Sequence, residues 1–160
     1  MTRLDHNEPE HVLEIFLQPG EFYWGDGQTR IRTLLGSCVS ICMWHPGDQI
    51  GGMCHFMLPE KPGSTEMTRD PRYADAAMLL FLGEITKSRT NLADYQVKIF
   101  GGANMLQESG KLDPVGDKNV AAARRLVKQY NLNLVAEHLG GSSARRLHFN
   151  LWDGSVWLRK

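Results

Sequence analysis

The sequence predicts an α+β fold, a layered α/β/β sandwich with mostly antiparallel sheets and two principal helices. Closely spaced β-rich segments occupy the first part of the chain, and two segments with helical periodicity lie further on. A last pair of β-rich segments, joined by a short turn, closes the sequence. At 160 residues, the chain has the size of one ordinary domain with its own core.

The first part of the chain contains four predicted strands. Residues 12–18 form the first strand, which ends at Pro19 and Gly20 because these residues favour a turn. The other three cover residues 28–35, 39–44 and 50–58, with short connections between them. Short connections favour antiparallel pairing of consecutive strands. Residues 1–11 are predicted to be a flexible tail, and residues 12–160 a single domain.

The remaining elements alternate between helix and strand. Apolar side chains recur at helical spacing in residues 73–87 and 117–130, and Asp117 is predicted to cap the second helix. Residues 60–72 contain prolines and charges and are predicted to be a loop. The later strands are predicted at residues 97–100, 132–138, 146–152 and 155–159. Together with the first four, they give about eight strands and two helices.

Composition excludes several classes of protein. Hydrophobic residues make up 42% of the chain, and its 18 basic residues equal its 18 acidic ones, which disfavours a nucleic-acid binder. No apolar run approaches the roughly 20 residues of a membrane-spanning helix, and the N-terminus has no secretory signal pattern. The three cysteines lie close together in the sequence, which indicates reduced thiols rather than a disulfide framework. We therefore expect a cytoplasmic protein.

Cys38 and His55 are the candidate catalytic residues. Cys38 follows a Gly-Ser turn, and His55 lies 17 residues later on the predicted return strand of a hairpin. A thiol is mostly protonated at neutral pH, so it needs a partner that accepts its proton or pairs with its thiolate. A histidine can do this and can then protonate a leaving group, while the N–H of Cys38 can stabilise an oxyanion.

Two other interpretations use the same residues. Cys38 has apolar neighbours and could be an ordinary core residue, as is predicted for Cys42 and Cys54. A metal site is disfavoured because Cys38 and Cys42 would lie about 13 Å apart on one strand. Adjacent Cys54 and His55 would also point to opposite faces of their strand.

Six ordered motifs resemble the chemoreceptor glutamine deamidase (CheD) family of bacterial chemotaxis. They are Leu-Gly-Ser-Cys-Val at 35–39, Gly-Met-Cys-His-Phe-Met-Leu-Pro at 52–59, Tyr-Ala-Asp-Ala-Ala at 73–77, Gly-Gly-Ala-Asn-Met at 101–105, Gly-Asp-Lys-Asn-Val at 116–120, and Ala-Glu-His-Leu-Gly-Gly at 136–141 with Arg145 following. The resemblance spans nearly the whole chain from residue 13 onwards. Several motifs in order are far more specific than any one of them.

The resemblance implies an enzyme that hydrolyses glutamine side-chain amides to glutamate on the cytoplasmic helices of methyl-accepting chemoreceptors. Cys38 would form a thioester, His55 would protonate the departing ammonia, and no cofactor would be needed. It also implies a fold similar to the catalytic domain of deamidating toxins. A CheC-type phosphatase is a second partner that the resemblance implies.

The chain departs from the family pattern at one position. Family members place a threonine six residues before the cysteine, where it orients the histidine; here that position is Arg32, and Thr33 is one residue nearer. On an unbroken strand Thr33 would face away from Cys38, although a bulge at Gly36 could restore the contact. Thr33 is therefore the predicted third site residue, and Arg32 is an alternative group that could lower the pKa of the thiol by its charge.

Two alternatives to the deamidase remain. The domain could be a chemotaxis binding module that engages a receptor or a CheC-type phosphatase with little catalysis. It could also catalyse another acyl transfer, as a transglutaminase-like enzyme or a thiol esterase. A primary amine would yield a cross-linked product only with a transamidating enzyme.

Overall fold

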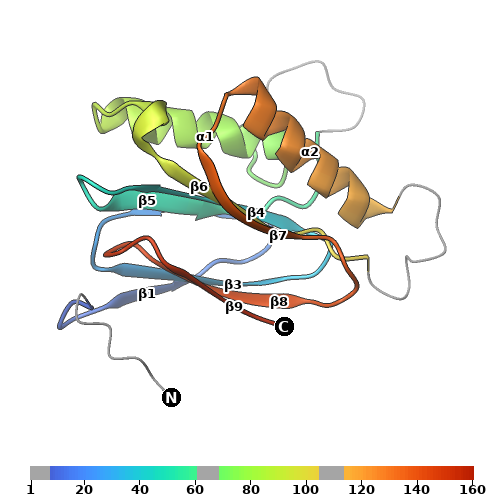
Figure 1. Ribbon diagram of the computed structural model, residues 1–160, viewed down its shortest axis with the longest axis horizontal. Coiled ribbons are helices and arrows are strands. Elements are labelled where there is room, and N and C mark those ends of the chain that lie inside the picture. The colour runs from blue at the N-terminus through green and yellow to red at the C-terminus, as the bar shows by residue number, and fades with distance from the viewer. Residues whose placement is uncertain (1–7, 61–68, 105–113) are drawn as a thin grey trace.

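Two helices and two β-sheets form three layers in the computed structural model, which describes residues 8–60, 69–104 and 114–160 (Figure 1). The helices cover one face of a five-stranded sheet, and a four-stranded sheet packs against its other face. Among the described residues, five of the seven strand pairings are antiparallel. The predicted α+β sandwich is therefore confirmed. The predicted tail (1–11) and loop (60–72) lie partly outside the described residues.

The five-stranded sheet has the order β2-β5-β4-β6-β7. Its strands are β2 (Phe22–Gly25), β4 (Val39–His45), β5 (Ile50–Cys54), β6 (Gln96–Gly101) and β7 (Leu134–Leu139). Strands β4 and β5 form the predicted hairpin, and β6 and β7 run parallel because α2 connects them. The first five residues of the central strand β4 are buried, which explains why it reads as a nearly continuous apolar run.

The four-stranded sheet has the order β1-β3-β8-β9. Its strands are β1 (Leu13–Phe16), β3 (Thr29–Leu35), β8 (Arg145–Asn150) and β9 (Val156–Arg159). Burial alternates along β3, so one of its faces meets the other sheet and the other face is open. This alternation directs Thr33 into the protein and Arg32 out of it.

The helices α1 (Ala74–Lys87) and α2 (Val115–Gln129) match the two predicted helices within two residues at each end. A short 3₁₀ helix, Leu92–Asp94, precedes β6. The predicted cap at Asp117 is wrong, because α2 begins earlier, with Pro114 at the N-cap position. Pro114 can stand there because the first N–H groups of a helix have no intrahelical partner. Asp117 lies in the first turn instead, and accepts a hydrogen bond from Asn104 Nδ2 at 2.7 Å.

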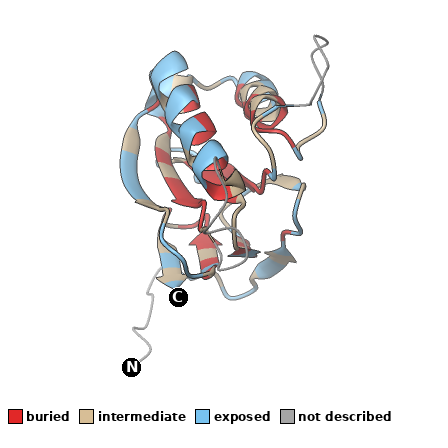
Figure 2. Cartoon of the chain, turned by 90° about the vertical axis from the view of Figure 1, so that its right-hand side faces the viewer, coloured by how far each residue is buried: buried red, intermediate tan, exposed pale blue. Residues whose placement is uncertain are grey.

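Two hydrophobic clusters hold the layers together. One fills the space between the helices and the five-stranded sheet, with Phe56, Phe81 and Tyr95 fully buried. The other lies between the two sheets and includes Phe149. Figure 2 shows that the buried residues of the helices lie on the sides that face the sheets. Each large buried apolar side chain stabilises the fold by roughly 1.5–3 kcal/mol.

Two features of the strand arrangement differ from expectation. The chain leaves the four-stranded sheet after β3 and enters the other sheet at β4, so these strands are not the expected antiparallel neighbours. Strand β3 pairs with β1 and β8 instead. Strand β2 is not predicted by the sequence pattern at all. Among the described residues, no helix combines the length and the apolar character needed to cross a membrane.

Candidate active site

Cys38 lies where the chain crosses from one sheet to the other, between the end of β3 and the start of β4. The residues that follow β6 hold this crossing. The N–H of Gly102 donates to the carbonyl of Cys38 at 2.8 Å, and the N–H of Ala103 donates to the carbonyl of Gly36 at 3.0 Å. Gly101 must be a glycine, because it has φ +113° and a Cβ there would lie 2.2 Å from the Cys38 carbonyl oxygen. The Gly-Gly motif at 101–102 therefore supports the candidate nucleophile.

His55 follows β5 and lies on the same face of the sheet as Cys38. Val39 and Phe56 exchange two backbone hydrogen bonds of 3.2 and 3.0 Å as an antiparallel pair. Extended by one residue, this register sets Cys38 opposite Met57 and therefore diagonal to His55 on one face. Diagonal residues on one face have Cα atoms about 7–8 Å apart, within reach of an imidazole ring.

This face of the five-stranded sheet looks toward the four-stranded sheet. Cys38 packs against the cluster between the sheets, and His55 contacts β3 of the four-stranded sheet. The adjacent Cys54 belongs to the cluster on the helix side. The prediction that Cys54 and His55 point to opposite faces is thus confirmed.

Thr33 fixes the orientation of His55. Its Oγ1 lies 2.7 Å from His55 Nδ1 and donates a hydrogen bond to the Leu17 carbonyl at 2.9 Å. A carbonyl only accepts, so the single hydroxyl proton is used on Leu17, and the hydroxyl oxygen must accept from His55. Nδ1 therefore carries the ring proton, and Nε2 presents a lone pair. The predicted contact between Thr33 and the histidine is present because β3 and β4 lie in different sheets, and no bulge is needed.

Burial holds both candidate catalytic groups in their neutral forms. His55 is 1% exposed, and burial lowers its pKa from 6.5 to about 4. Cys38 is partly exposed, and burial raises the pKa of its thiol from 9.0 to about 11. Both shifts oppose a preformed thiolate–imidazolium pair, which was one of the expected arrangements. The resting site therefore holds a thiol beside a neutral imidazole.

The expectation for Arg32 is wrong. Arg32 lies on the open face of β3, where its side chain approaches Glu14 at 3.6 Å. The pKa of the Cys38 thiol is raised by burial rather than lowered by a neighbouring charge. Arg32 and Cys38 do not share a face, because the chain changes sheets between them.

Asn119 on α2 connects the two halves of the site. It is fully buried, and its Nδ2 donates to the carbonyl of Ser37 at 3.0 Å and to that of Met57 at 2.9 Å. These carbonyls belong to the residue before Cys38 and to the residue opposite Cys38 in the extended register. No sequence pattern identifies the two carbonyls that Asn119 binds.

Ser40 is a further polar group of the site that sequence reasoning missed. The register sets it opposite His55, on the face that Cys38 shares. Its hydroxyl is fully buried and has no hydrogen-bond partner among the described residues. The sequence spacing could have identified Ser40: it lies two residues after Cys38, and residues two apart in an extended chain point to the same face.

The other thiols belong to the core, as predicted. Cys42 is 1% exposed and Cys54 is fully buried, where its Sγ accepts the N–H of Ile41 at 3.4 Å. Burial raises the pKa of both thiols, so they are poor nucleophiles and poor metal ligands. Within residues 8–60, 69–104 and 114–160, no group of three or more His, Cys, Asp or Glu side chains could hold a metal ion.

Comparisons with known proteins identify relatives of this chain. The family described as CheD chemotactic sensory transduction matches residues 57–160. A protein of Dechloromonas aromatica named probable chemoreceptor glutamine deamidase CheD 3 is 48% identical over 151 residues, which cover 94% of this chain and 89% of that protein. A protein of Leptospira interrogans named probable chemoreceptor glutamine deamidase CheD 1 is 43% identical over 162 residues, covering 96% of each chain. The resemblance read from the six motifs is confirmed, and the chain belongs to the CheD family.

Proposed function

We propose that this protein is a protein-glutamine amidohydrolase that converts glutamine side chains of chemoreceptors to glutamate, with Cys38 as nucleophile and His55 as general base and acid. The names of the relatives supply the reaction and its substrate. The observation that carries the residue assignment is the pair of hydrogen bonds made by Thr33. They leave Nε2 of a buried imidazole unprotonated on the face that it shares with Cys38.

In the first half of the reaction, the Cys38 thiol gives its proton to His55 Nε2 as sulfur attacks the carboxamide carbon. The tetrahedral intermediate collapses when the imidazolium returns that proton to the amide nitrogen. The C–N bond breaks, ammonia leaves, and a thioester joins the substrate to Cys38. The low pKa of His55 makes its imidazolium a strong acid. This favours proton transfer to the amide nitrogen, which is a poor leaving group until it is protonated.

In the second half, His55 Nε2 takes a proton from water, and the resulting hydroxide attacks the thioester carbon. The C–S bond breaks, glutamate is released, and the proton returns to the Cys38 sulfur. Thr33 holds the ring in the same tautomer in both halves, because its hydroxyl keeps accepting the Nδ1 proton.

The N–H of Cys38 is the proposed donor to the oxyanion in both tetrahedral intermediates. It donates to no acceptor within the described part of the chain, so it is available to the substrate. The Ser37 carbonyl shares one planar peptide unit with this N–H and accepts a hydrogen bond from Asn119 Nδ2 at 3.0 Å, which fixes the direction of the N–H. A rigid donor is worth more than a mobile one, because it needs no reorganisation during the reaction.

A rapid acid quench tests the thioester. The protein is turned over with a chemoreceptor cytoplasmic fragment, quenched in acid, digested and analysed by mass spectrometry. A receptor peptide joined to the Cys38 peptide with loss of ammonia is expected, and its absence from Cys38→Ala gives the control. Receptor glutamines converted without any adduct, and with equal rate in Cys38→Ala, would contradict the mechanism.

Adding a primary amine to the same reaction separates hydrolysis from transamidation. A deamidase releases glutamate even with the amine present, whereas a transglutaminase-like enzyme yields mainly the amine conjugate. Binding of a CheC-type phosphatase stays a prediction, and the same variants can be tested for it by titration.

A further inference from the structure

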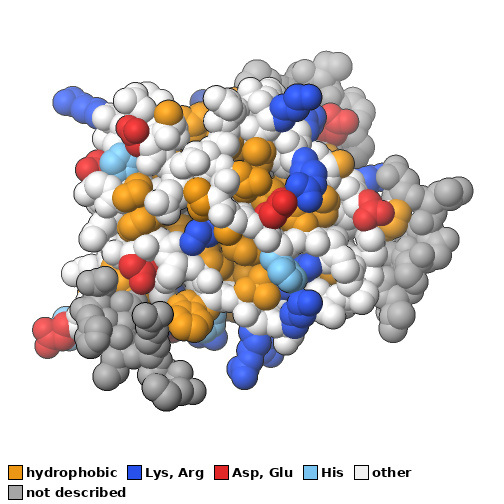
Figure 3. Space-filling view, viewed as in Figure 1, with side chains coloured by type: hydrophobic (Ala, Val, Ile, Leu, Met, Phe, Trp, Pro, Cys, Tyr) orange, Lys and Arg blue, Asp and Glu red, His pale blue; other side chains and the backbone are white. Residues whose placement is uncertain are grey.

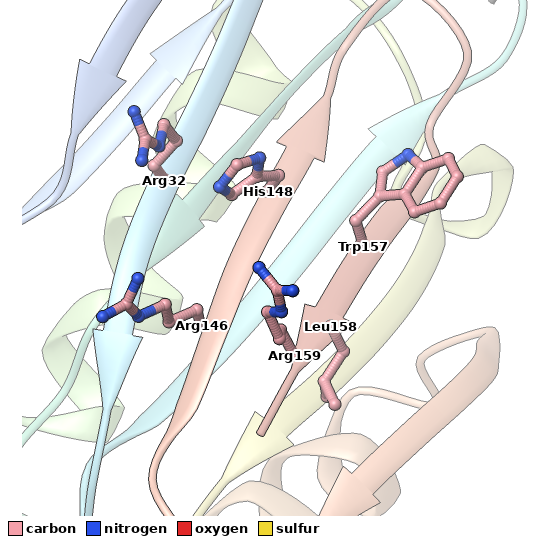
Figure 4. A pocket seen from close by; sticks show the side chains of 6 residues that line it. All are labelled: Arg32, Arg146, His148, Trp157, Leu158 and Arg159. Carbon is pink, nitrogen blue, oxygen red and sulfur yellow. The ribbon is translucent and has the colours of Figure 1, made fainter. Parts of the chain in front are cut away.

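The open face of the four-stranded sheet carries basic and aromatic side chains in register. Arg32, His148 and Trp157 occupy one row across β3, β8 and β9. Leu34, Arg146 and Arg159 occupy the next row toward the end of β3. A hollow of about 380 Å³ lies between these side chains. Figure 4 shows the arrangement of the arginines, His148 and Trp157 that line it. We call this surface the basic sheet face.

The positive charge of this face is only partly neutralised. Arg146 and Arg159 are exposed, and neither forms an ion pair with an acidic residue in the described part of the chain. Arg32 approaches Glu14 at 3.6 Å, but its Nε is buried and has no hydrogen-bond partner among the described residues. Figure 3 shows basic side chains projecting from the lower edge of the molecule, where Figure 1 places β8 and β9. Since the whole chain has zero net charge, this is a local concentration of positive charge.

His148 adds a polar group rather than a charge. Burial lowers its pKa below the usual 6.5, and the charges of Arg32 and Arg30 lower it further, against a smaller opposite effect of Glu14. The ring is therefore neutral at neutral pH. The positive charge of the basic sheet face comes from its arginines.

Apolar side chains flank the arginines. Trp157 is 58% exposed, Phe16 is 54% exposed and Leu34 is 49% exposed. A second hollow, of about 210 Å³, adjoins the first and is lined by Phe16, Leu34 and Arg146 among others. Exposed apolar groups between arginines are typical of a binding surface, because arginine and tryptophan dominate binding energy in interfaces.

The basic sheet face lies close to the candidate nucleophile. Leu34 is four residues before Cys38, so the chain can separate them by at most about 14 Å. Arg146 pairs with Leu34, and Arg159 pairs with Arg146, so both arginines belong to this near row. An α-helix covers about 14 Å in about nine residues. One helical segment could therefore contact both this row and Cys38.

We propose that the basic sheet face docks an acidic, amphipathic helical segment of the chemoreceptor substrate, beside the glutamine that Cys38 attacks. This proposal rests on the proposed function. Guanidinium groups bind carboxylates through two parallel hydrogen bonds, and Trp157, Phe16 and Leu34 fit the apolar side of the same helix. The basic sheet face lies close to Cys38, and this favours a substrate segment as its ligand. Binding to a membrane surface would not require proximity to the nucleophile.

Binding without turnover tests the proposal. The full chain with Cys38→Ala is titrated with a chemoreceptor cytoplasmic fragment, and Kd is measured by calorimetry at two salt concentrations. Arg146→Glu with Arg159→Glu is expected to raise Kd roughly tenfold or more and to flatten its salt dependence. The matched control, Lys87→Glu with Arg89→Glu, makes the same change of charge at the end of α1 and is expected to leave Kd within about twofold.

Kinetics with the active protein give a second readout. The Arg146→Glu, Arg159→Glu variant is expected to raise KM for the receptor fragment and leave kcat unchanged, because it removes binding and no catalytic group. Trp157→Ala is expected to raise Kd as well. An unchanged Kd in both variants would overturn the proposal.

Other outcomes separate this proposal from its rivals. If the Arg146→Glu, Arg159→Glu variant loses binding to vesicles containing phosphatidylserine but binds the receptor fragment like the wild-type protein, the basic sheet face binds membranes and the proposal is overturned. If the wild-type protein binds the receptor fragment through these arginines but converts no glutamine, docking stands and the proposed function fails. Conversion by the Arg146→Glu, Arg159→Glu variant with the wild-type KM would contradict docking and leave the proposed function intact.

Discussion

Replacing Thr33 by valine removes the hydroxyl that fixes His55 and keeps a side chain of nearly the same shape. Thr33 is 2% exposed, and its partners Leu17 and His55 are equally buried. Valine leaves the Leu17 carbonyl and the His55 Nδ1 proton without a partner. Each buried group left unpaired costs about 1–3 kcal/mol, so the free energy of unfolding should fall by roughly 2–6 kcal/mol. Denaturant unfolding measures this change.

The same substitution should lower kcat for receptor deamidation. Without the acceptor at Thr33, the neutral ring can carry its proton on Nε2, and that tautomer cannot accept the thiol proton. The loss should lie between about tenfold, equivalent to one hydrogen bond of about 1.4 kcal/mol, and roughly 10⁴-fold, the cost of a wrong tautomer in a catalytic triad. KM should change little, because Thr33 is buried away from the substrate.

Thr33→Ser is the matched control, because it keeps the hydroxyl and loses one methyl group. It should retain most of kcat, and nitrogen NMR of the imidazole should find the proton on Nδ1, as in the wild-type protein. In Thr33→Val, the same spectra should find a mixture of tautomers. A folded Thr33→Val protein with wild-type kcat would refute the role assigned to Thr33.

Four further predictions concern the site. The pKa of the Cys38 thiol is near 11, so its thiolate fraction at pH 7 is about 100-fold lower than that of an ordinary thiol with a pKa of 9.0. The more basic thiolate is about tenfold more nucleophilic, so iodoacetamide should alkylate Cys38 about tenfold more slowly than a model thiol. Faster alkylation, with an inflection near pH 4, would indicate a preformed ion pair instead. His55 must be neutral to accept a proton, so kcat/KM should persist below pH 6.5 and fall only as the pH drops through about 4. The free energy of unfolding should fall earlier, between pH 6.5 and about 4, because in that range the unfolded state binds a proton that the folded state does not. An acid limb of kcat/KM centred at 6.5 would contradict the burial effect. Asn119→Asp removes the two hydrogen bonds that Asn119 donates to the Ser37 and Met57 carbonyls. It should lower kcat at least tenfold, measured by turnover, and the free energy of unfolding by about 2–4 kcal/mol, measured by denaturant unfolding. Wild-type turnover would show that α2 does not position the site. Gly101→Ala should abolish most activity, because the added Cβ would collide with the Cys38 carbonyl. Gly140→Ala is the control: Gly140 has φ +80° and open space around it, so the substitution should lower the free energy of unfolding by only roughly 1–2 kcal/mol and keep activity. Equal turnover in the two variants would contradict this.

Local patterns in the sequence predicted most of the helices and strands. The apolar periodicity of residues 73–87 predicted α1, and the turn between 45 and 50 predicted the β4–β5 hairpin. That hairpin brings Cys38 and His55 to one face, so the central pair of the site was accessible from sequence spacing. Both inferences depend on neighbours in the sequence, where periodicity is informative.

Contacts between distant segments were not predictable in the same way. The short connection after β3 suggested pairing with β4, but burial of the apolar residues of β4 between two layers places β3 in the other sheet. Strand β2 has only four residues and lies between turn signals, too short for a period to be visible. The parallel pairings β1–β3 and β6–β7 join segments separated by other elements, and no local pattern encodes them.

The supporting residues of the site illustrate the same limit. The predicted geometry of Thr33 on a continuous strand would have turned it away from Cys38, and only the change of sheet explains its bond to His55. Asn119 reaches carbonyls 62 and 82 residues away in the sequence. Residues that support the site through such long-range contacts can be identified only from the three-dimensional arrangement of the three layers.

The central claim is that Cys38 and His55 together convert receptor glutamines to glutamate, and one assay tests it most directly. A chemoreceptor cytoplasmic fragment is incubated with the wild-type protein, with Cys38→Ala, with His55→Ala and with the core variant Cys42→Ala as a matched control. Peptide mass spectrometry then measures glutamine-to-glutamate conversion at each site. We predict site-specific conversion by the wild-type protein and by Cys42→Ala, and none above background by the other two variants. Conversion that survives in folded Cys38→Ala, or its absence from the folded and reduced wild-type protein, would contradict the account.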